Sequence, residues 1–364
     1  MLFASPVGSL VGSRVSATLE TPLGGFFGID LPDVVPDVGG LAAVWEVAET
    51  RHAWTNATSA LASLVAHLRP GSVWLPGYIC SSVLAAVPRE VQRFFPLRED
   101  LSPETDAMES RLSHGDMVLA VDMFGRAPGP DWHAFVAAHS DVTFVEDCAQ
   151  ALDTGTAAWG DWRLYSPRKL VGVPEGGLLA PVSQRAQAQA ADLPGPIEGA
   201  DPSEIIRRLA PALARLERPD ANDLWHPMHQ SSEADAAVTA HGMSKFARGL
   251  LAALDPKPLA ETRRRNFRQL AAPLEPYAVL PEADPCFAPF GFPVALPPDL
   301  RERVRDRLHA SRIFPAIHWN DIAAPSEFTA DYLRARSLLT LPCDHRYGPN
   351  DMERLATTFL ESLT

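Results

Sequence analysis

Hydrophobic residues between positions 50 and 180 occur in short runs bounded by glycine, proline or aspartate. Several runs are continuous rather than alternating, which is typical of strands covered on both faces of a parallel sheet. The stretches between them carry apolar residues at helical spacing. This pattern predicts strands in SVWLPGY, VQRFFPL, MVLAVDMFG, VTFVEDCAQ, WRLYSPRK and GGLLAPV, and helices in SALASLVAHL, PETDAMESRL and WHAFVAAHS.

The pattern changes after residue 180. Residues 186–216 look helical with proline-rich interruptions, and residues 243–274 look like two helices broken at Asp255 to Pro258. The rest of the chain reads as a small α+β unit built from FGFPVAL, DLRERVRDRLHASR, SLLTLPCD and NDMERLATTFLESL. We expect an α/β protein with an N-terminal segment (1–40), a large domain with a mostly parallel sheet (41–265) and a smaller C-terminal α+β domain (266–364).

Charge and cysteine content restrict the class of protein. The formal net charge is −13, which argues against nucleic acid or an anionic membrane as the main partner. Four widely spaced cysteines with no CxxC pair indicate neither a disulfide framework nor a metal site. The N-terminus lacks a charged region before its apolar run, and no stretch reaches 18 apolar residues. We therefore expect a soluble, cytoplasmic protein that acts on small molecules.

Lysine is rare in this chain. Of the 32 lysines and arginines, only Lys169, Lys245 and Lys257 are lysine. An amine can form a Schiff base, which a guanidinium cannot, so Lys169 is a candidate catalytic residue. Compositional drift is the alternative explanation, and the neighbouring residues must decide between the two.

A carboxylate accompanies this lysine. Asp147 ends a predicted buried strand at the sheet edge where ligands of such folds bind. Pyridoxal phosphate needs a lysine that holds it and a carboxylate against its pyridine nitrogen, so that the ring can accept electrons. Taken alone, an acidic residue at the end of a strand is more often a helix cap or the partner of a nearby arginine.

A phosphate site is the third requirement. Ala57, Thr58 and Ser59 open an apolar helical run, and a helix N-terminus offers hydroxyl groups and free backbone amides to an anion. Serine and threonine are also ordinary helix caps, so this feature has weight only together with Lys169 and Asp147.

Taken in order, the segments ATSAL, LPGYICSSV, VDMFG, FVEDCAQAL and YSPRKLVGVPEGG resemble the DegT/DnrJ/EryC1/StrS family. These are fold type I pyridoxal phosphate aminotransferases, best known for aminating keto groups of nucleotide-linked sugars. The resemblance covers residues 40–180 well and the rest loosely, and it implies a divergent member. It also implies a homodimer with the active site at the subunit boundary.

The resemblance assigns roles to individual residues. Thr58, with Ser59 and Ala57 beside it, would contact the cofactor phosphate. Asp147 would pair with the pyridine nitrogen, and Gln150 would lie over the cofactor near its ring oxygen. Lys169 stands at the family's interval before Glu-Gly-Gly and would hold the cofactor.

The chain also departs from the family. The usual phosphate-binding serine is replaced by Leu164, so we expect Ser166 to supply the missing donor, with Arg168 as the second candidate. On this view Ser166→Ala weakens cofactor binding roughly tenfold, about 1.4 kcal/mol. The alternative is that Ser166 only begins a turn. Position 57 is alanine rather than glycine.

Two further family features are altered. The segment TAHGMSKFARG stands for the family's N-x-R-[ML]-S motif, whose asparagine reaches the neighbouring subunit's cofactor, but it lacks both that asparagine and the arginine. The aromatic residue that stacks on the cofactor is expected near Cys80, and Tyr78 is the nearest ring.

Two residues near the C-terminus are candidates for substrate binding. Arg346 has a two-pronged donor fork suited to a carboxylate or phosphate, although an ion pair with Asp344 explains it equally well. His318 invites a similar interpretation, with core packing as the alternative.

The sequence thus favours an aminotransferase that moves an amino group from an amino acid, with glutamate as the first candidate, to a keto sugar or a similar carbonyl compound. Two alternatives remain open: a pyridoxal phosphate lyase, dehydratase or replacement enzyme, and a non-catalytic descendant. Retention of Lys169, Asp147 and Gln150 argues against the last. Lys169→Ala should abolish the yellow colour of bound cofactor.

Overall fold

A seven-stranded sheet forms the centre of the large unit in the computed structural model, which describes residues 21–32, 40–45, 52–152, 158–197, 201–234, 238–280 and 287–364. All neighbouring strands are parallel except where the strand β8 pairs with its two neighbours. The predicted α/β fold with a mostly parallel sheet is confirmed. The strands lie in the order β2 (Ala53–Trp54), β8 (Gly177–Pro181), β7 (Trp162–Tyr165), β6 (Thr143–Asp147), β5 (Met117–Val121), β3 (Val73–Pro76) and β4 (Gln92–Phe95).

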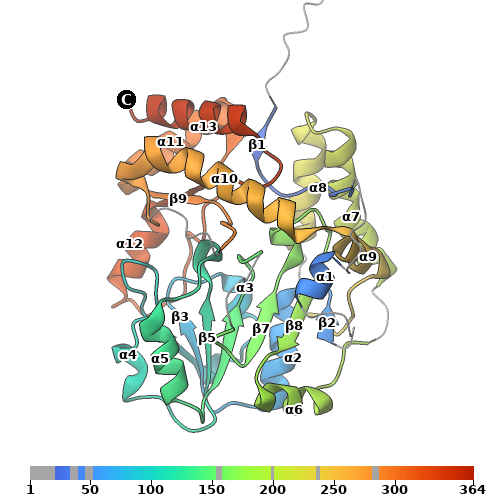
Figure 1. Cartoon of the computed structure of the whole chain (residues 1–364), viewed down its shortest axis with the longest axis vertical. Coiled ribbons are helices and arrows are strands. Elements are labelled where there is room, and N and C mark those ends of the chain that lie inside the picture. Colours follow the sequence, from blue (N-terminus) through green and yellow to red (C-terminus); the bar gives the residue numbers. More distant parts are fainter. Residues whose placement is uncertain are drawn as a thin grey trace, which may run out of the picture.

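The central strands are uniformly apolar because helices and loops cover both faces of the sheet. All five residues of β5 are buried, and the strand β6 is buried except at its first residue. Figure 1 shows the sheet in the lower half of the molecule, with helices around it. These helices are α2 (Ala57–Leu68), α3 (Ser81–Leu84), α4 (Asp106–Glu109), α5 (Pro130–Ala138) and α6 (Gln184–Asp192), and the short 3-10 turns are η2 (Arg89–Val91), η3 (Met123–Gly125) and η4 (Pro167–Lys169).

A group of four helices follows the sheet in sequence. The break predicted at Asp255 to Pro258 is present, because one helix ends at Ala253 and the next begins at Pro256. Pro256 and Pro258 lie in the first turn of the second helix, where a missing N–H costs nothing, and Asp255 caps it. The helices are α7 (Pro202–Glu217), α8 (Asn222–Ala234), α9 (Lys245–Ala253) and α10 (Pro256–Leu274); α1 (Gly40–Val44) packs on α9.

The C-terminal part packs above the sheet (Figure 1). The predicted strands FGFPVAL and SLLTLPCD form an antiparallel pair, β9 (Phe292–Ala295) and β11 (Leu338–Leu341). The proposed boundary at residue 265 falls inside α10, which runs from the large unit to this one, and the three-part division remains a prediction. The other elements are η5 (Glu275–Tyr277), α11 (Pro298–Ala310), β10 (Ile313–Phe314), α12 (Thr329–Ser337) and α13 (Pro349–Ser362).

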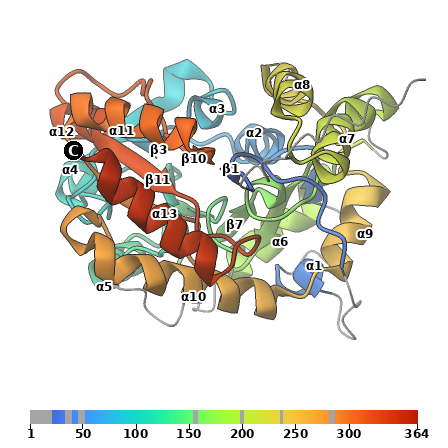
Figure 2. The same cartoon turned by 90° about the horizontal axis from the view of Figure 1, so that it is seen from above.

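Residues 21–32, which we call the N-terminal strap, pair with a strand of the C-terminal part of the chain. The strand β1 (Leu23–Gly24) pairs in parallel with β10. Seen from above, the strap lies between the α7–α8 pair and the C-terminal helix α13 (Figure 2). Asp30 connects the strap to the large unit: its amide donates to the Gly172 carbonyl, and its carboxylate accepts from the Gly172 amide. The strap therefore contacts both parts of the protein.

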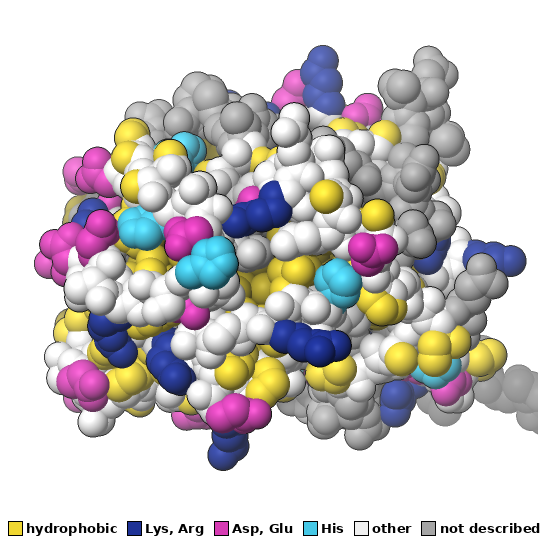
Figure 3. Space-filling model, turned by 90° about the horizontal axis from the view of Figure 1, so that it is seen from below, with side chains coloured by type: hydrophobic (Ala, Val, Ile, Leu, Met, Phe, Trp, Pro, Cys, Tyr) yellow, Lys and Arg dark blue, Asp and Glu magenta, His cyan; other side chains and the backbone are white. Residues whose placement is uncertain are grey.

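On the face seen from below, acidic and basic side chains are interspersed rather than gathered in one patch (Figure 3). Among the described residues, no helix has the length and apolar character needed to cross a membrane.

Candidate active site

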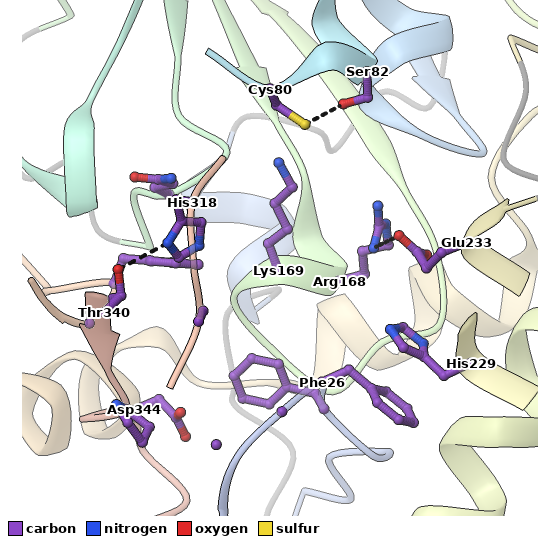
Figure 4. Close-up of a pocket in the computed structure, with 18 of the residues that line it drawn as sticks. Phe26, Cys80, Ser82, Arg168, Lys169, His229, Glu233, His318, Thr340 and Asp344 are labelled. Carbon is purple, nitrogen blue, oxygen red and sulfur yellow. Dashed lines mark hydrogen bonds and ion pairs between the residues drawn. The ribbon is translucent and has the colours of Figure 1, made fainter. Parts of the chain in front are cut away.

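A cavity of about 490 Å³ lies where the carboxyl ends of the sheet strands meet the strap and the C-terminal part. Predicted site residues Thr58, Gln150, Lys169, His318 and Arg346 all line it. In Figure 4, Lys169 lies between His318 on one side and Arg168 on the other, and it points toward Cys80 and Ser82. Residues distant in sequence thus surround the amine.

Lys169 ends the 3-10 turn η4 just after β7. Its amide donates to the carbonyl of Ser166 (3.1 Å), and the Val171 amide donates to Pro167, so the turn is held by its own backbone. The amine forms no hydrogen bond or ion pair with any described residue. It is therefore available to a ligand in the cavity.

Asp147 ends β6 beside Leu164 of the neighbouring strand. Its carboxylate is 4 % exposed, and one oxygen accepts from the Ala149 amide (2.9 Å). The other oxygen has no hydrogen-bond partner in the described part of the chain. Burial raises the pKa of Asp147, and the positive charge of Lys169 acts in the opposite direction. A cationic N–H near this carboxylate would stabilise its charged form.

Gln150 is fixed at the cavity wall by its carbonyl oxygen. This atom accepts from the Phe124 amide at 2.6 Å, so the amide nitrogen remains as a donor toward the cavity. Phe124 has a left-handed backbone (φ 56°), which is uncommon for a bulky residue. Strain of this kind persists where surrounding contacts enforce it, and here Gln150 is one of those contacts.

The N-terminus of α2 supplies a free donor. Asn56 caps the helix through Ser59 and forms a parallel β-bridge with Gly176, which engages the Ala57 amide, whereas the Thr58 amide has no partner among the described residues. Thr58 lines the cavity. Ser59 is fully buried, donates its hydroxyl to Asn56 and accepts from the Thr239 amide, so its donor is already used.

The Glu-Gly-Gly sequence explains how this helix is positioned. A side chain on Gly177 would lie 2.0 Å from the Asn56 backbone, and Gly176 has a φ of +134°, so both positions require glycine. Glu175 accepts from the Ser244 amide (2.7 Å). The segment TAHGMSKFARG, which contains Ser244, is therefore tied to this loop within one chain.

Five predicted cofactor ligands are not among the residues that line the cavity: Ala57, Ser59, Tyr78, Asp147 and Ser166. Ser166 is 3 % exposed, at the start of η4. Tyr78 is fully buried, and its hydroxyl donates to the His318 carbonyl. Cys80 takes the cavity position near which a stacking ring was expected. The roles of Ser166 and Tyr78 stay predictions that the geometry does not favour.

His318 lines the cavity opposite Arg168 and bonds to the Thr340 hydroxyl through Nδ1 at 3.0 Å. Burial lowers the pKa of His318 to about 4, and the charge of Lys169 adds to the effect. The imidazole is therefore neutral near pH 7 and can accept or donate a hydrogen bond without adding charge.

Arg346 is engaged by the protein itself. Its Nε and Nη2 bond to the two oxygens of Asp344 at 2.8 and 2.9 Å, and further donors bond to the carbonyls of Phe26 and Gly25. Although burial opposes ionisation of Asp344, Arg346 holds the pKa of that carboxyl well below its usual range. The structural ion pair, the alternative weighed from sequence, is what the structure contains.

Sequence reasoning named Arg168 only as a second candidate for the phosphate, and it missed Glu233 and His229. Arg168 forms an ion pair with Glu233 of α8 (3.0 Å), and the ring of His229 stacks on Phe26 of the strap at 3.8 Å between centroids. Figure 4 shows Arg168 with Glu233 above His229. No motif signals these contacts, because they join segments that are far apart in the chain.

Behind the cavity, Asp122, Glu146 and Cys148 form a buried cluster of potential metal ligands. Arg163 binds both oxygens of Glu146, and Trp159 donates to Asp122 at 3.1 Å. Burial, followed by the charge of Glu146, raises the pKa of Asp122 well above its ordinary value. These groups are already paired and do not suggest a metal site.

The groups without partners match the needs of pyridoxal phosphate. Within the described residues, an amine (Lys169), a carboxylate oxygen (Asp147), an amide donor (Gln150) and the N–H and hydroxyl of Thr58 are left available near one cavity. In addition, the Nε of Arg168 is buried without a hydrogen-bond partner among the described residues. Buried polar groups are normally satisfied, so this many vacant ones in one place indicate a polar ligand.

No protein-family model and no curated protein matches this chain. Its fold is nevertheless similar to that of solved aminotransferases. The PseC aminotransferase of Helicobacter pylori, involved in the biosynthesis of pseudoaminic acid, matches with a TM-score of 0.64 at 12 % identity, covering 94 % of this chain and 99 % of PseC. DesV of S. venezuelae, solved with a ketimine intermediate, matches at 0.62 and 17 %, covering 88 % and 86 %.

A DegT DnrJ EryC1 StrS aminotransferase of Brucella abortus has a TM-score of 0.60 and 16 % identity, with 90 % of this chain and 91 % of the Brucella protein covered. Such matches concern the fold, and they agree with the resemblance seen in the motifs. The chain has the fold type I architecture of the DegT/DnrJ/EryC1/StrS sugar aminotransferases.

Proposed function

We propose that this protein is a pyridoxal phosphate-dependent aminotransferase that transfers an amino group from an amino acid to a carbonyl compound such as a nucleotide-linked keto sugar. The observation that carries the proposal is the unpartnered Lys169 amine, placed at the same sheet edge as the buried Asp147 carboxylate. The cofactor, when bound, supplies an electron-withdrawing ring that carries the amino group between the two substrates.

The chain's own residues then have distinct tasks. The Lys169 Nζ would hold the cofactor and, once released, would move the proton between the substrate carbon and the cofactor carbon, since its amine would lie beside the bond that changes. Asp147 keeps the ring nitrogen protonated. Gln150 donates its amide N–H to the ring oxygen. Neutral His318 orients a substrate polar group on the opposite side of the cavity.

The phosphate is held at the N-terminus of α2. The Thr58 amide lies in the first turn, where the helix dipole favours an anion, and the Thr58 hydroxyl adds a second donor. This arrangement replaces the serine that Leu164 has displaced.

A spectroscopic experiment tests the proposal. The protein purified with pyridoxal phosphate is expected to be yellow, and adding glutamate or other amino acids one at a time should convert the bound cofactor to pyridoxamine phosphate. No acceptor needs to be known. Lys169→Ala should lose the colour, whereas Lys245→Ala, at an exposed position, should keep it. A colourless wild-type protein would refute the proposal.

We also propose a cytoplasmic homodimer. The support is the shared fold, since symmetric dimers are common among soluble oligomers, and in the resemblance the active site lies at the subunit boundary. Analytical ultracentrifugation at micromolar concentration should show a dimer. A monomer that still binds cofactor would contradict this part.

A further inference from the structure

Arg168 is the cavity-lining arginine whose donors are least used. Its Nη1 meets one oxygen of Glu233 at 3.0 Å, and its Nε is buried without a hydrogen-bond partner among the described residues. A guanidinium normally engages a carboxylate through two parallel N–H groups. The Arg168–Glu233 pair therefore uses one N–H group of the guanidinium and leaves the buried Nε of Arg168 without a hydrogen bond.

The other two arginines that line the cavity differ from Arg168. Arg208 directs both Nε and Nη2 to Glu204, and Arg346 directs both to Asp344. Both pairs thus use two N–H groups of the arginine, and none of the four side chains is more than 19 % exposed. Arg168 and Glu233 are instead 25 % and 35 % exposed in their side chains, so Glu233 can exchange its partner for water at little cost.

Glu233 also reaches the cavity from a different element. It lies in the last turn of α8, one turn after His229, whose ring stacks on Phe26. Burial lowers the pKa of His229 to about 4, so this neighbour is neutral near pH 7 and does not hold Glu233 in place. Within the described residues, Arg168 is the cation to which Glu233 is paired.

We propose that Arg168 binds an oxyanion of the ligand, and that Glu233 is an exchangeable internal counter-ion which occupies this position until the anion displaces it. The anion is either the phosphate of the cofactor or a carboxylate or phosphate of the substrate. Both sources present oxygens that fit the Arg168 fork. The inference rests on the proposed function only in taking this cavity as the ligand site.

Binding measurements on Arg168→Gln, Glu233→Gln and the double variant test the proposal. The probes are inorganic phosphate, succinate, pyridoxal phosphate and pyridoxal, titrated by calorimetry. Glu233→Gln removes the competing anion, so at least one phosphate- or carboxylate-bearing probe should bind about tenfold more tightly. Arg168→Gln should weaken the same probe about tenfold, and the double variant should match Arg168→Gln, because the two residues act through one contact.

The pattern across probes identifies the source of the anion. If Arg168→Gln weakens pyridoxal phosphate but not pyridoxal, the cofactor phosphate is bound. If it weakens succinate on the cofactor-loaded protein and leaves cofactor affinity unchanged, the substrate carboxylate is bound. Unchanged affinity of every probe in Glu233→Gln, or in Arg168→Gln, would overturn the proposal.

Matched controls separate this effect from surface charge and from the proposed function. Arg98→Gln and Asp131→Asn alter an exposed ion pair outside the cavity and should leave all affinities unchanged. If Arg168→Gln does not fold, Arg168→Lys keeps the charge, loses the fork and should still weaken binding. Phosphate binding repeated in Lys169→Ala shows whether the Glu233 effect persists when the cofactor cannot be held.

Discussion

The cavity has one wall from the sheet and one from the strap and C-terminal turn, and the two walls use their polar groups differently. On the sheet side, Lys169, Asp147 and Thr58 keep donors or acceptors without partners among the described residues. On the strap side, Arg346 and Asp344 satisfy each other and the strap carbonyls. Both walls are rich in charged groups, but in the described part of the chain the sheet wall is the one that leaves them without partners.

The comparison shows that vacancy, rather than residue type, separates binding groups from structural ones. Arg346 has a fork suited to anions, yet it stabilises the strap. Arg168, adjacent to the lysine and without a motif of its own, keeps an unused donor. A vacant buried group costs stability, so its presence indicates a ligand that satisfies it.

Asp147→Asn should have the largest effect, a slower conversion of the bound cofactor, and it tests whether the vacant groups of the sheet wall bind the ligand. It removes a buried carboxylate whose pKa is raised by burial, so we expect the cofactor-free protein to be as stable as the wild type or more stable. The ring nitrogen loses its charged partner, and conversion of bound cofactor by amino donors should slow by about 10² or more. Stopped-flow absorbance and urea melts measure the two quantities. A loss of stability with unchanged kinetics would show that Asp147 is a structural residue.

Arg346→Met tests the opposite wall. It leaves Asp344 charged and buried without its partner, which typically costs about 3–5 kcal/mol in the free energy of unfolding. Cofactor affinity, measured where the variant is folded, should change less than threefold. Arg305→Met removes an exposed pair on α11 and is the control. Wild-type stability combined with lost substrate binding would restore the substrate role first predicted for Arg346.

Thr58→Ala and Ser59→Ala compare a vacant hydroxyl with an engaged one on the same helix turn. A hydrogen bond to a charged phosphate is worth about 1.5–3 kcal/mol, so Thr58→Ala should weaken pyridoxal phosphate binding at least tenfold. Ser59→Ala should affect stability more than affinity, because the Ser59 hydroxyl bonds to Asn56 and Thr239. Fluorescence titration of the cofactor distinguishes them, and Ser166→Ala can be tested in the same series. Equal affinities for Thr58→Ala and wild type would refute the α2 phosphate site.

Per pH unit, the pH dependence of stability is the smallest effect. The pKa of His318 is about 4 in the folded protein and about 6.5 in an unfolded chain. Below about pH 6.5 the unfolded chain gains a proton that folded His318 does not, so the free energy of unfolding falls with pH by up to about 1.4 kcal/mol per unit until about pH 4. His318→Gln should reduce this slope in urea melts recorded across the window. An identical slope would show that His318 is not held neutral.

Most of the fold follows from local patterns. The runs in MVLAV and VTFVED became β5 and β6 because continuous apolar residues suit strands covered on both faces. PETDAMESRL was predicted as a full helix but forms only the short α4, which has no side-chain cap. Pairing of the strap with β10 could not be predicted, since it depends on residues almost 300 positions apart.

The site was predictable where a motif fixes the backbone. Gly176 and Gly177 permit the close approach that places Asn56 and the start of α2, so Thr58 and Lys169 line the same cavity. Roles that were inferred from residue type alone are not favoured by the geometry. Ser166, Ser59 and Tyr78 have suitable groups, but their burial and existing contacts come from tertiary packing that the sequence does not display.

Reductive trapping is the most direct test of the central claim that the cavity holds pyridoxal phosphate on Lys169. The protein is incubated with pyridoxal phosphate, reduced with borohydride, digested and mapped by mass spectrometry. With three lysines in the chain, each site can be followed separately. The account predicts a stable adduct on the Lys169 peptide, lost in Lys169→Ala, with Lys245 and Lys257 unmodified at stoichiometric cofactor. No adduct, or one on Lys245 or Lys257 alone, would contradict it.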